Sequence, residues 1–265
     1  MGLGVTLAVC LVGMTGHLVE VEAHLAASVP GFTLVGLPDT SLAESRDRVR
    51  AAVASTGLVL PQRKVTVNLS PASLPKSGSG YDLAIAVAML AGAGLVRHEG
   101  LARTVHLGEL GLDGRVHPVR GVLPAVAAAA AAGVTRVVVP AANAAEAGLV
   151  PGVEVYGAHR LAEVVARYGA DVVVPPEVEV RPGGQVPVHV GTGLGDLSDV
   201  VGQAPARAAL EVAAAGGHHL LMVGPPGTGK TMLAQRLPGL LPALTESEAI
   251  EVTSVHSVAG TFDAS

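Results

Sequence analysis

The stretch Gly224-Pro-Pro-Gly-Thr-Gly-Lys230-Thr231 decides the class of fold, because it matches the P-loop pattern G-x-x-x-x-G-K-[ST]. An apolar segment, His219–Val223, precedes it, and a helical pattern runs from Thr231 to about Leu237. Strand, loop and helix in this order form the setting that phosphate binding requires. The glycines let backbone N–H groups approach an anion, and the helix directs its positive end at it. The stretch therefore predicts a P-loop NTPase domain.

Each part of the loop has a predicted role in binding ATP and Mg²⁺. The ammonium group of Lys230 would reach the β- and γ-phosphates, and the hydroxyl of Thr231 would hold Mg²⁺. The alternative is a chance match in a glycine-rich chain, for which the residue frequencies give odds of about one in two hundred. The residues predicted to bind the cofactor in this loop are Gly224, Pro225, Pro226, Gly227, Thr228, Gly229, Lys230 and Thr231.

Hydrolysis of ATP needs more than this loop, namely a carboxylate for Mg²⁺ and a group that orients water. The acidic residues after the loop are Glu246, Glu248, Glu251 and Asp263, and none of them ends a run of four apolar residues. We interpret them as the solvated face of a helix that starts near Thr245. We therefore expect the chain to be the N-terminal part of a longer ATPase, without catalytic residues of its own.

The composition excludes several other classes of protein. About half of the 265 residues are hydrophobic, so a large core is possible, and the net charge of −5 does not indicate a protein that coats nucleic acid. The single cysteine, Cys10, excludes an internal disulfide and fits a reducing cytosol. The apolar run Val5–Val12 lacks a preceding basic segment and is too short to span a membrane. We expect a cytoplasmic protein with no membrane partner.

The first 172 residues alternate between strand-like and helix-like patterns, which predicts an α/β or α+β domain. A proline-rich segment over residues 173–195 then reads as a linker, and the nucleotide-binding domain follows over 196–265. The predicted strands are 5–12, 19–25, 32–35, 64–69, 104–107, 136–139 and 219–223. The predicted helices are 41–55, 82–93, 123–132, 143–148, 161–168, 205–215 and 231–237, with a short one from 245.

Several segments closely resemble the magnesium-chelatase-like AAA+ ATPases, and more narrowly the ComM (YifB) group. The segments that carry the resemblance are Asp199-Val-Val-Gly-Gln203, Leu210–His219, Leu221–Met232, Pro30–Pro38, Glu44–Arg50, Val67–Lys76 and Ser254–Gly260. They are specific, and the resemblance extends over essentially the whole chain.

The resemblance implies an N-terminal domain similar to the proteolytic domain of Lon, of the ribosomal-S5-domain-2-like class, followed by the start of an AAA+ domain. It places Val201, Gly202 and Gln203 near the adenine of ATP. It also implies a homo-hexameric ring when the protein is full length, and a motor that moves DNA branch points during natural transformation. A magnesium-chelatase motor subunit and a non-catalytic assembly module remain as alternatives, although a domain of about 170 residues before the P-loop favours the DNA motor.

A further alternative, proteolysis, can be tested against the Lon motifs. Lon-type proteases use a Ser–Lys dyad, in which lysine deprotonates the serine nucleophile. Pro75–Asp82 matches the serine motif, but Gly80 occupies the serine position. Gly108–Val116 matches the segment before the lysine, but Leu123 falls where the lysine should be. Both members of the dyad are missing, so we do not expect a protease.

Three arginines, Arg46, Arg48 and Arg50, cluster on one predicted helix. Arg46 and Arg50 share a face, since residues four apart on a helix are neighbours. One interpretation is a solvated face with Glu44 and Asp47 as partners. The other is a patch that contacts DNA or another subunit.

Overall fold

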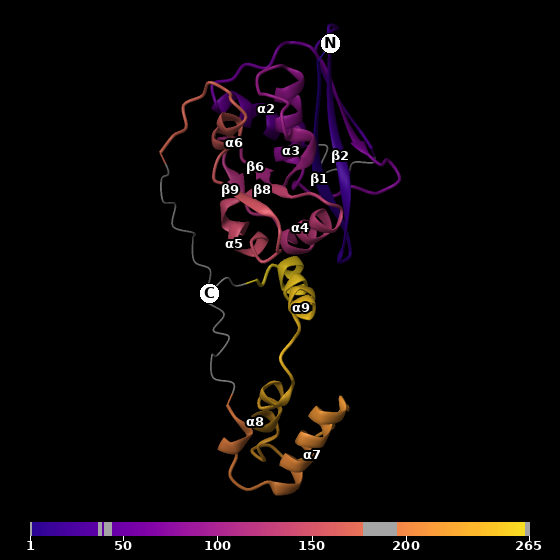
Figure 1. Cartoon of the computed structure of the whole chain (residues 1–265), viewed down its shortest axis with the longest axis vertical. Helices are drawn as coiled ribbons and strands as arrows, with labels where there is room; N and C mark the ends of the chain where they lie inside the picture. Colours follow the sequence, from indigo (N-terminus) through magenta and orange to yellow (C-terminus); the bar gives the residue numbers. More distant parts are fainter. Residues whose placement is uncertain (1, 37–38, 40–43, 177–194, 263–265) are drawn as a thin grey trace. The chain divides into compact units, whose positions relative to one another are not determined.

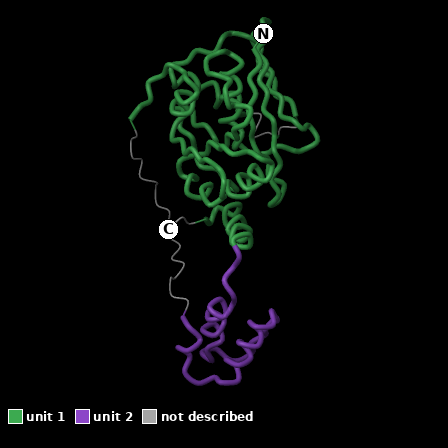
Figure 2. Tube along the Cα trace, in the orientation of Figure 1, with its two compact units in different colours: residues 1–178, 246–265 green, residues 179–245 purple. Residues whose placement is uncertain are grey.

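The computed structural model describes residues 2–36, 39, 44–176 and 195–262. The chain forms two compact units, which Figure 2 colours differently. Unit 1 comprises residues 1–178 together with 246–265, and unit 2 comprises residues 179–245. No helix in the described ranges has the length and apolar character needed to cross a membrane.

Unit 1 is built on a seven-stranded sheet with the order β3-β4-β2-β1-β5-β8-β9. Figure 1 labels β1, β2, β8 and β9 of this sheet. The β2 strand lies antiparallel to both β1 and β4, and the remaining neighbours are parallel. The strands are β1 Gly2–Val12, β2 Thr15–Ala26, β3 Gly31–Val35, β4 Lys64–Ser70, β5 Thr104–His106, β8 Arg136–Pro140 and β9 Glu154–Ala158. A separate small hairpin pairs β6 Glu109–Leu110 with β7 Val116–His117.

Helices cover both faces of this sheet because alternate residues of its strands are apolar on each side. On one face, Ala8 and Cys10 of β1 belong to a core shared with α2, α3 and α6. On the other face, Val9 belongs to a second core shared with α4 and α5. The helices are α2 Ser45–Ser55, α3 Asp82–Gly92, α4 Val122–Ala131, α5 Ala144–Ala147 and α6 Leu161–Arg167.

This mixed α/β architecture confirms the predicted fold class, and six of the predicted strands are present within one or a few residues. The sequence reading missed β9, whose pentapeptide Glu154-Val-Tyr-Gly-Ala has no clear alternation, and the two-residue strands β6 and β7. The helix predicted over 41–55 begins at Ser45, and its first residues fall outside the described ranges. Most of the predicted linker, 177–194, also lies outside them.

Unit 2 contains α7 Ala204–Gly216 and α8 Lys230–Ala234 around a small apolar cluster. The strand predicted over 219–223 is wrong, because these residues form no strand, and Leu221 and Val223 are each 86% exposed. A strand exists only as part of a hydrogen-bonded sheet, and the described residues of unit 2 contain no other strand for it to pair with.

The helix expected near Thr245 is longer than predicted and packs on unit 1. It is α9, Glu246–Ala259, and it lies against α4. Ile250 packs against the core under α4, and the amide of Gly121 donates a 3.2 Å hydrogen bond to the carbonyl oxygen of Ser257. The compact unit that contains the P-loop therefore ends at residue 245 in this chain. The predicted division at 172 and 195 stays a prediction.

Candidate nucleotide-binding site

The backbone of the P-loop follows a path that needs glycine. Gly227 and Gly229 have φ angles of +84° and +82°, a conformation that other residues rarely adopt. A Cβ atom at Gly227 would meet nothing within 4 Å, so the space beside the loop is open. The α8 helix begins directly afterwards at Lys230. The loop can therefore present backbone N–H groups to an anion without a side chain in the way.

The ammonium group of Lys230 folds back onto the loop. Its Nζ donates hydrogen bonds to the carbonyl oxygens of Gly224 at 2.8 Å and Pro225 at 2.7 Å, and lies 3.3 Å from Thr228 Oγ1. These contacts hold the cation at the loop, where phosphate oxygens would replace the carbonyls as its partners. Thr231, the predicted Mg²⁺ residue, is exposed in the first turn of α8.

Gln203 joins the segment before α7 to the P-loop. It has a left-handed φ of +57°, and its Nε2 donates a 2.8 Å hydrogen bond to the carbonyl oxygen of Thr228. Of the three residues expected near adenine, Gln203 is thus brought to the loop. Val201 is 94% exposed and, like Gly202, does not line the cavity beside the loop. Their contact with adenine stays a prediction.

A cavity of about 400 Å³ adjoins the loop, within the size range of small-molecule sites. The residues that line it are Gln203, Ala206, Ala209, Leu220, Leu221, Met222, Val223, Gly224, Pro225, Thr228, Lys230 and Leu233. Sequence reasoning missed Ala206 and Ala209, although they follow Gln203 at intervals of three residues, the spacing of one helix face. Apolar walls next to an anion-binding loop and a lysine fit a nucleotide, with its base in the cavity and its phosphates at the loop.

The acidic residues after the loop do not belong to unit 2. Glu246, Glu248 and Glu251 are exposed on α9, as expected for a solvated helix face, and α9 belongs to unit 1. Asp263 is outside the described residues.

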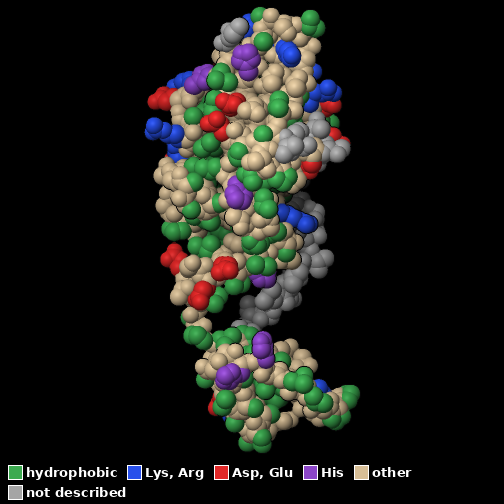
Figure 3. Space-filling view, turned by 90° about the vertical axis from the view of Figure 1, so that its right-hand side faces the viewer, with side chains coloured by type: hydrophobic (Ala, Val, Ile, Leu, Met, Phe, Trp, Pro, Cys, Tyr) green, Lys and Arg blue, Asp and Glu red, His purple; other side chains and the backbone are tan. Residues whose placement is uncertain are grey.

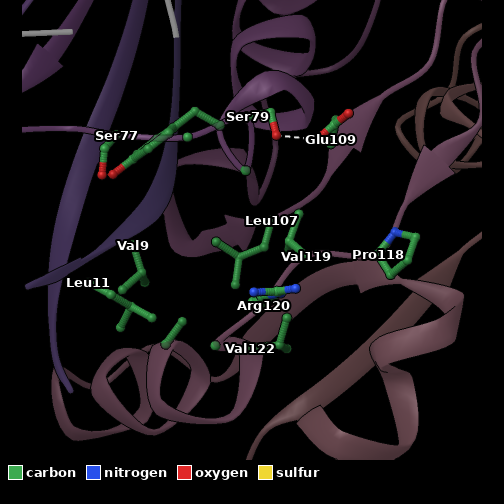
Figure 4. Close-up of a pocket in the computed structure, with 15 residues that line it drawn as sticks. Val9, Leu11, Ser77, Ser79, Leu107, Glu109, Pro118, Val119, Arg120 and Val122 are labelled. Atoms are coloured by element: carbon green, nitrogen blue, oxygen red, sulfur yellow. Dashed lines mark hydrogen bonds between the residues drawn. The ribbon is translucent and has the colours of Figure 1, made fainter. Parts of the chain in front are cut away.

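The positions of the Lon-type dyad hold residues that cannot do its chemistry. Gly80 has no side chain, and its carbonyl oxygen accepts a 3.0 Å hydrogen bond from the amide of Gly108. Leu123 is fully buried in α4. The nearby Lys76 is 1% exposed, and its amine donates to the carbonyl oxygen of Pro71, while burial lowers its pKa. The hydroxyl of Ser79 donates to the carboxylate of Glu109 (Figure 4).

The three arginines of α2 have different surroundings. Arg46 is exposed and forms an ion pair with Asp47, and Arg50 is also exposed. Arg48 instead reaches the buried Asp82, with Nε 2.6 Å from Oδ2 and Nη2 3.0 Å from Oδ1. Burial raises the pKa of Asp82, and this ion pair opposes that effect. The choice between a solvated face and a contact patch stays open for Arg46 and Arg50 alone.

Comparison with known proteins gives matches over both units. The family pattern "Subunit ChlI of Mg-chelatase" matches residues 21–143, and "Magnesium chelatase, subunit ChlI" matches residues 196–265. An uncharacterized protein of Mycobacterium tuberculosis is 52% identical over 260 residues, covering 98% of this chain and 50% of the relative. Competence protein ComM of Haemophilus influenzae is 42% identical over 258 residues, with 97% and 50% covered. The chain thus spans about half the length of these curated relatives.

A Lon protease of Salinispora arenicola is 30% identical over 173 residues, which cover 61% of this chain and 22% of that protease. Together with the mixed α/β sheet, this similarity supports the Lon-like fold expected for the N-terminal domain.

Proposed function

Because the chain belongs to the ComM/YifB family of Mg-chelatase-like proteins, we propose that it is the N-terminal part of an ATP-driven motor that binds ATP and Mg²⁺ at its P-loop. The observation that carries the proposal is the P-loop itself, in which the ammonium of Lys230 and the left-handed Gly227 and Gly229 gather beside an apolar cavity. This combination binds phosphate groups and a planar base together.

Each residue of the site has a distinct task in this proposal. The amides of the loop and Lys230 hold the phosphates, Thr231 contributes its hydroxyl to Mg²⁺, and Gln203 fixes the loop through Thr228. Bound Mg²⁺ would neutralise charge on the phosphates. Turnover needs a carboxylate and a water-orienting group, which we place in the part of the full-length protein that corresponds to the other half of its relatives.

The resemblance to ComM supports a hexameric motor on DNA as the role of the full-length protein. The net charge of this chain does not by itself indicate DNA binding, since it is −5. On the face shown in Figure 3, basic and acidic side chains are interspersed over unit 1. We therefore place the main DNA contacts in the assembled full-length ring.

The direct test is nucleotide binding by this chain. Lys230→Ala should weaken the binding of a fluorescent ATP analogue at least tenfold in the presence of Mg²⁺, because it removes the cation that faces the phosphates. Lys64→Ala, which removes an exposed lysine at the start of β4, is the matched control and should bind as the wild type does. Equal affinity of the Lys230→Ala variant and the wild type would refute the assigned site.

The motor role needs the full-length protein and a four-way DNA junction. ATP-dependent movement of the junction that is lost on Lys230→Ala would support the proposal. ATP hydrolysis that DNA does not stimulate, together with a static junction, would contradict it and favour a chelatase-type motor.

A further inference from the structure

A second cavity, of about 370 Å³, opens in unit 1 next to β1, on the side of the sheet that α4 covers (Figure 4). Val9 and Leu11 of β1, Leu107 after β5, and Val122 of α4 give it an apolar floor. The loop over residues 77–81 forms another wall. This cavity belongs to neither the P-loop nor its neighbouring residues.

The cavity lies where the sheet has an internal edge. The β1 strand pairs with β2 along its whole length. With β5 it pairs only through Leu7 and Val105. After β5 ends, the amide of Leu107 donates to Val138 in β8, so the chain turns away from β1. Among the described residues, no strand pairs with residues 8–12 of β1 on the side away from β2. Such an edge is a template for another extended chain.

The wall opposite this edge leaves room. A Cβ atom at Gly78 would meet nothing within 4 Å, and one at Gly80 would meet only Val119 Cγ1, at 3.9 Å. The Cβ positions of this loop therefore border open space, although the amide of Gly78 donates to the carboxylate of Asp39 and the carbonyl oxygen of Gly80 accepts from the amide of Gly108. An extended segment between the loop and β1 could place an apolar side chain over Val9 and Leu11, which point to the same face because strands have a period of two.

The charged side chains on the cavity wall indicate which class of ligand it can bind. Glu109 contributes a partly buried carboxylate, which accepts a hydrogen bond from Ser79, and Arg120 contributes an exposed guanidinium group. Glu109 would repel the phosphates of a nucleic acid, whereas Arg120 would attract them. A polypeptide carries both donors and acceptors along its backbone and is compatible with both signs of charge.

We propose that this cavity binds an extended segment of polypeptide, which adds a strand beside residues 8–12 of β1 and inserts an apolar side chain toward Val9 and Leu11. The bound segment is held and not cleaved, because Gly80 and Leu123 occupy the two dyad positions. The proposal is independent of the ATP site, so Lys230→Ala should leave this binding intact.

The test uses fluorescein-labelled β-casein, a polypeptide with little fixed structure, and measures its anisotropy as the chain is added. We expect saturable binding that Gly80→Leu weakens at least tenfold, because the leucine fills the cavity without requiring a left-handed backbone. Gly31→Leu, at the start of β3, is the matched control, since a Cβ there also meets open space. It should bind casein as the wild type does, and casein should stay intact.

A second measurement needs no variant. Amide hydrogen exchange of the wild-type chain should slow at residues 8–12 when casein is bound. Absence of saturable binding, equal affinity of the Gly80→Leu and Gly31→Leu variants, or unchanged exchange at residues 8–12 would overturn the proposal. Displacement of casein by a single-stranded 20-nucleotide DNA would assign the cavity to nucleic acid and overturn it as well.

Discussion

The side chain of Gln203 donates a 2.8 Å hydrogen bond to the carbonyl oxygen of Thr228 and so links the segment before α7 directly to the P-loop. Removing this bond should loosen the loop and weaken nucleotide binding. For Gln203→Ala we expect a loss of about 0.5–1.5 kcal/mol, or about two- to tenfold in affinity for a fluorescent ATP analogue. Gln235→Ala, an exposed glutamine just after α8, is the control and should change little. Equal affinities of the two variants would contradict the role of this bond.

The left-handed backbone of Gln203 allows a further prediction. Glycine adopts a φ of +57° without strain, whereas alanine does not. Gln203→Gly and Gln203→Ala should therefore bind nucleotide equally weakly, while the glycine variant is the more stable by about 1 kcal/mol. Urea unfolding followed by the circular dichroism of the helices measures this difference. Lower stability of the glycine variant would show that the backbone conformation is not strained.

The ion pair between Arg48 and Asp82 should matter for the stability of unit 1. The Asp82 side chain is fully buried and that of Arg48 is 19% exposed, so loss of the arginine leaves a buried carboxylate without its partner. We expect Arg48→Met to lower the free energy of unfolding by about 3 kcal/mol. Arg46→Met breaks an exposed pair with Asp47, which solvent screens, and should lower the stability much less than Arg48→Met does. Similar losses in the two variants, measured by urea unfolding, would contradict this assignment.

Buried His106 should make stability depend on pH. Its Nδ1 lies 2.8 Å from the Thr6 hydroxyl and its Nε2 lies 2.9 Å from the Tyr168 hydroxyl, and burial lowers its pKa to about 3. The unfolded chain takes up this proton below about pH 6.5, but the folded chain does not. The contribution of His106 to the pH dependence is therefore absent above about pH 6.5. Below it, the free energy of unfolding falls by at most about 1.4 kcal/mol per pH unit as the pH drops toward about 3.

The measurement for His106 is urea unfolding at several values between pH 7 and pH 4. His106→Gln should show a shallower fall in stability than the wild type over this range. His117→Gln, which removes an exposed histidine of β7, should keep the wild-type slope. A wild-type slope in the His106→Gln variant would show that His106 does not carry the effect.

Most of unit 1 could be predicted from the sequence because its elements depend on local patterns. The apolar run Val5–Val12 marked β1, a strand-like pattern marked β2, and Gly133 marked the end of α4. The pairing of Arg48 with Asp82 could not be predicted, since 34 residues separate them and only the packing of α2 on α3 brings them together. The same holds for Ser79 and Glu109.

The nucleotide site shows a different limit. The P-loop was found from its motif, since phosphate binding constrains consecutive residues. The strand before it was expected for the same reason, yet residues 219–223 have no neighbouring strand within the described part of unit 2. The packing of α9 could not be predicted from its position in the sequence either, because its contacts with α4 depend on the surface of unit 1.

The position of α9 has a consequence for limited proteolysis. The exposed residues 241–245 join unit 2 to a helix that belongs to unit 1. A single nick in this connection would therefore cut the chain without releasing its last segment. Both fragments should elute together on gel filtration and separate only when unit 1 is unfolded.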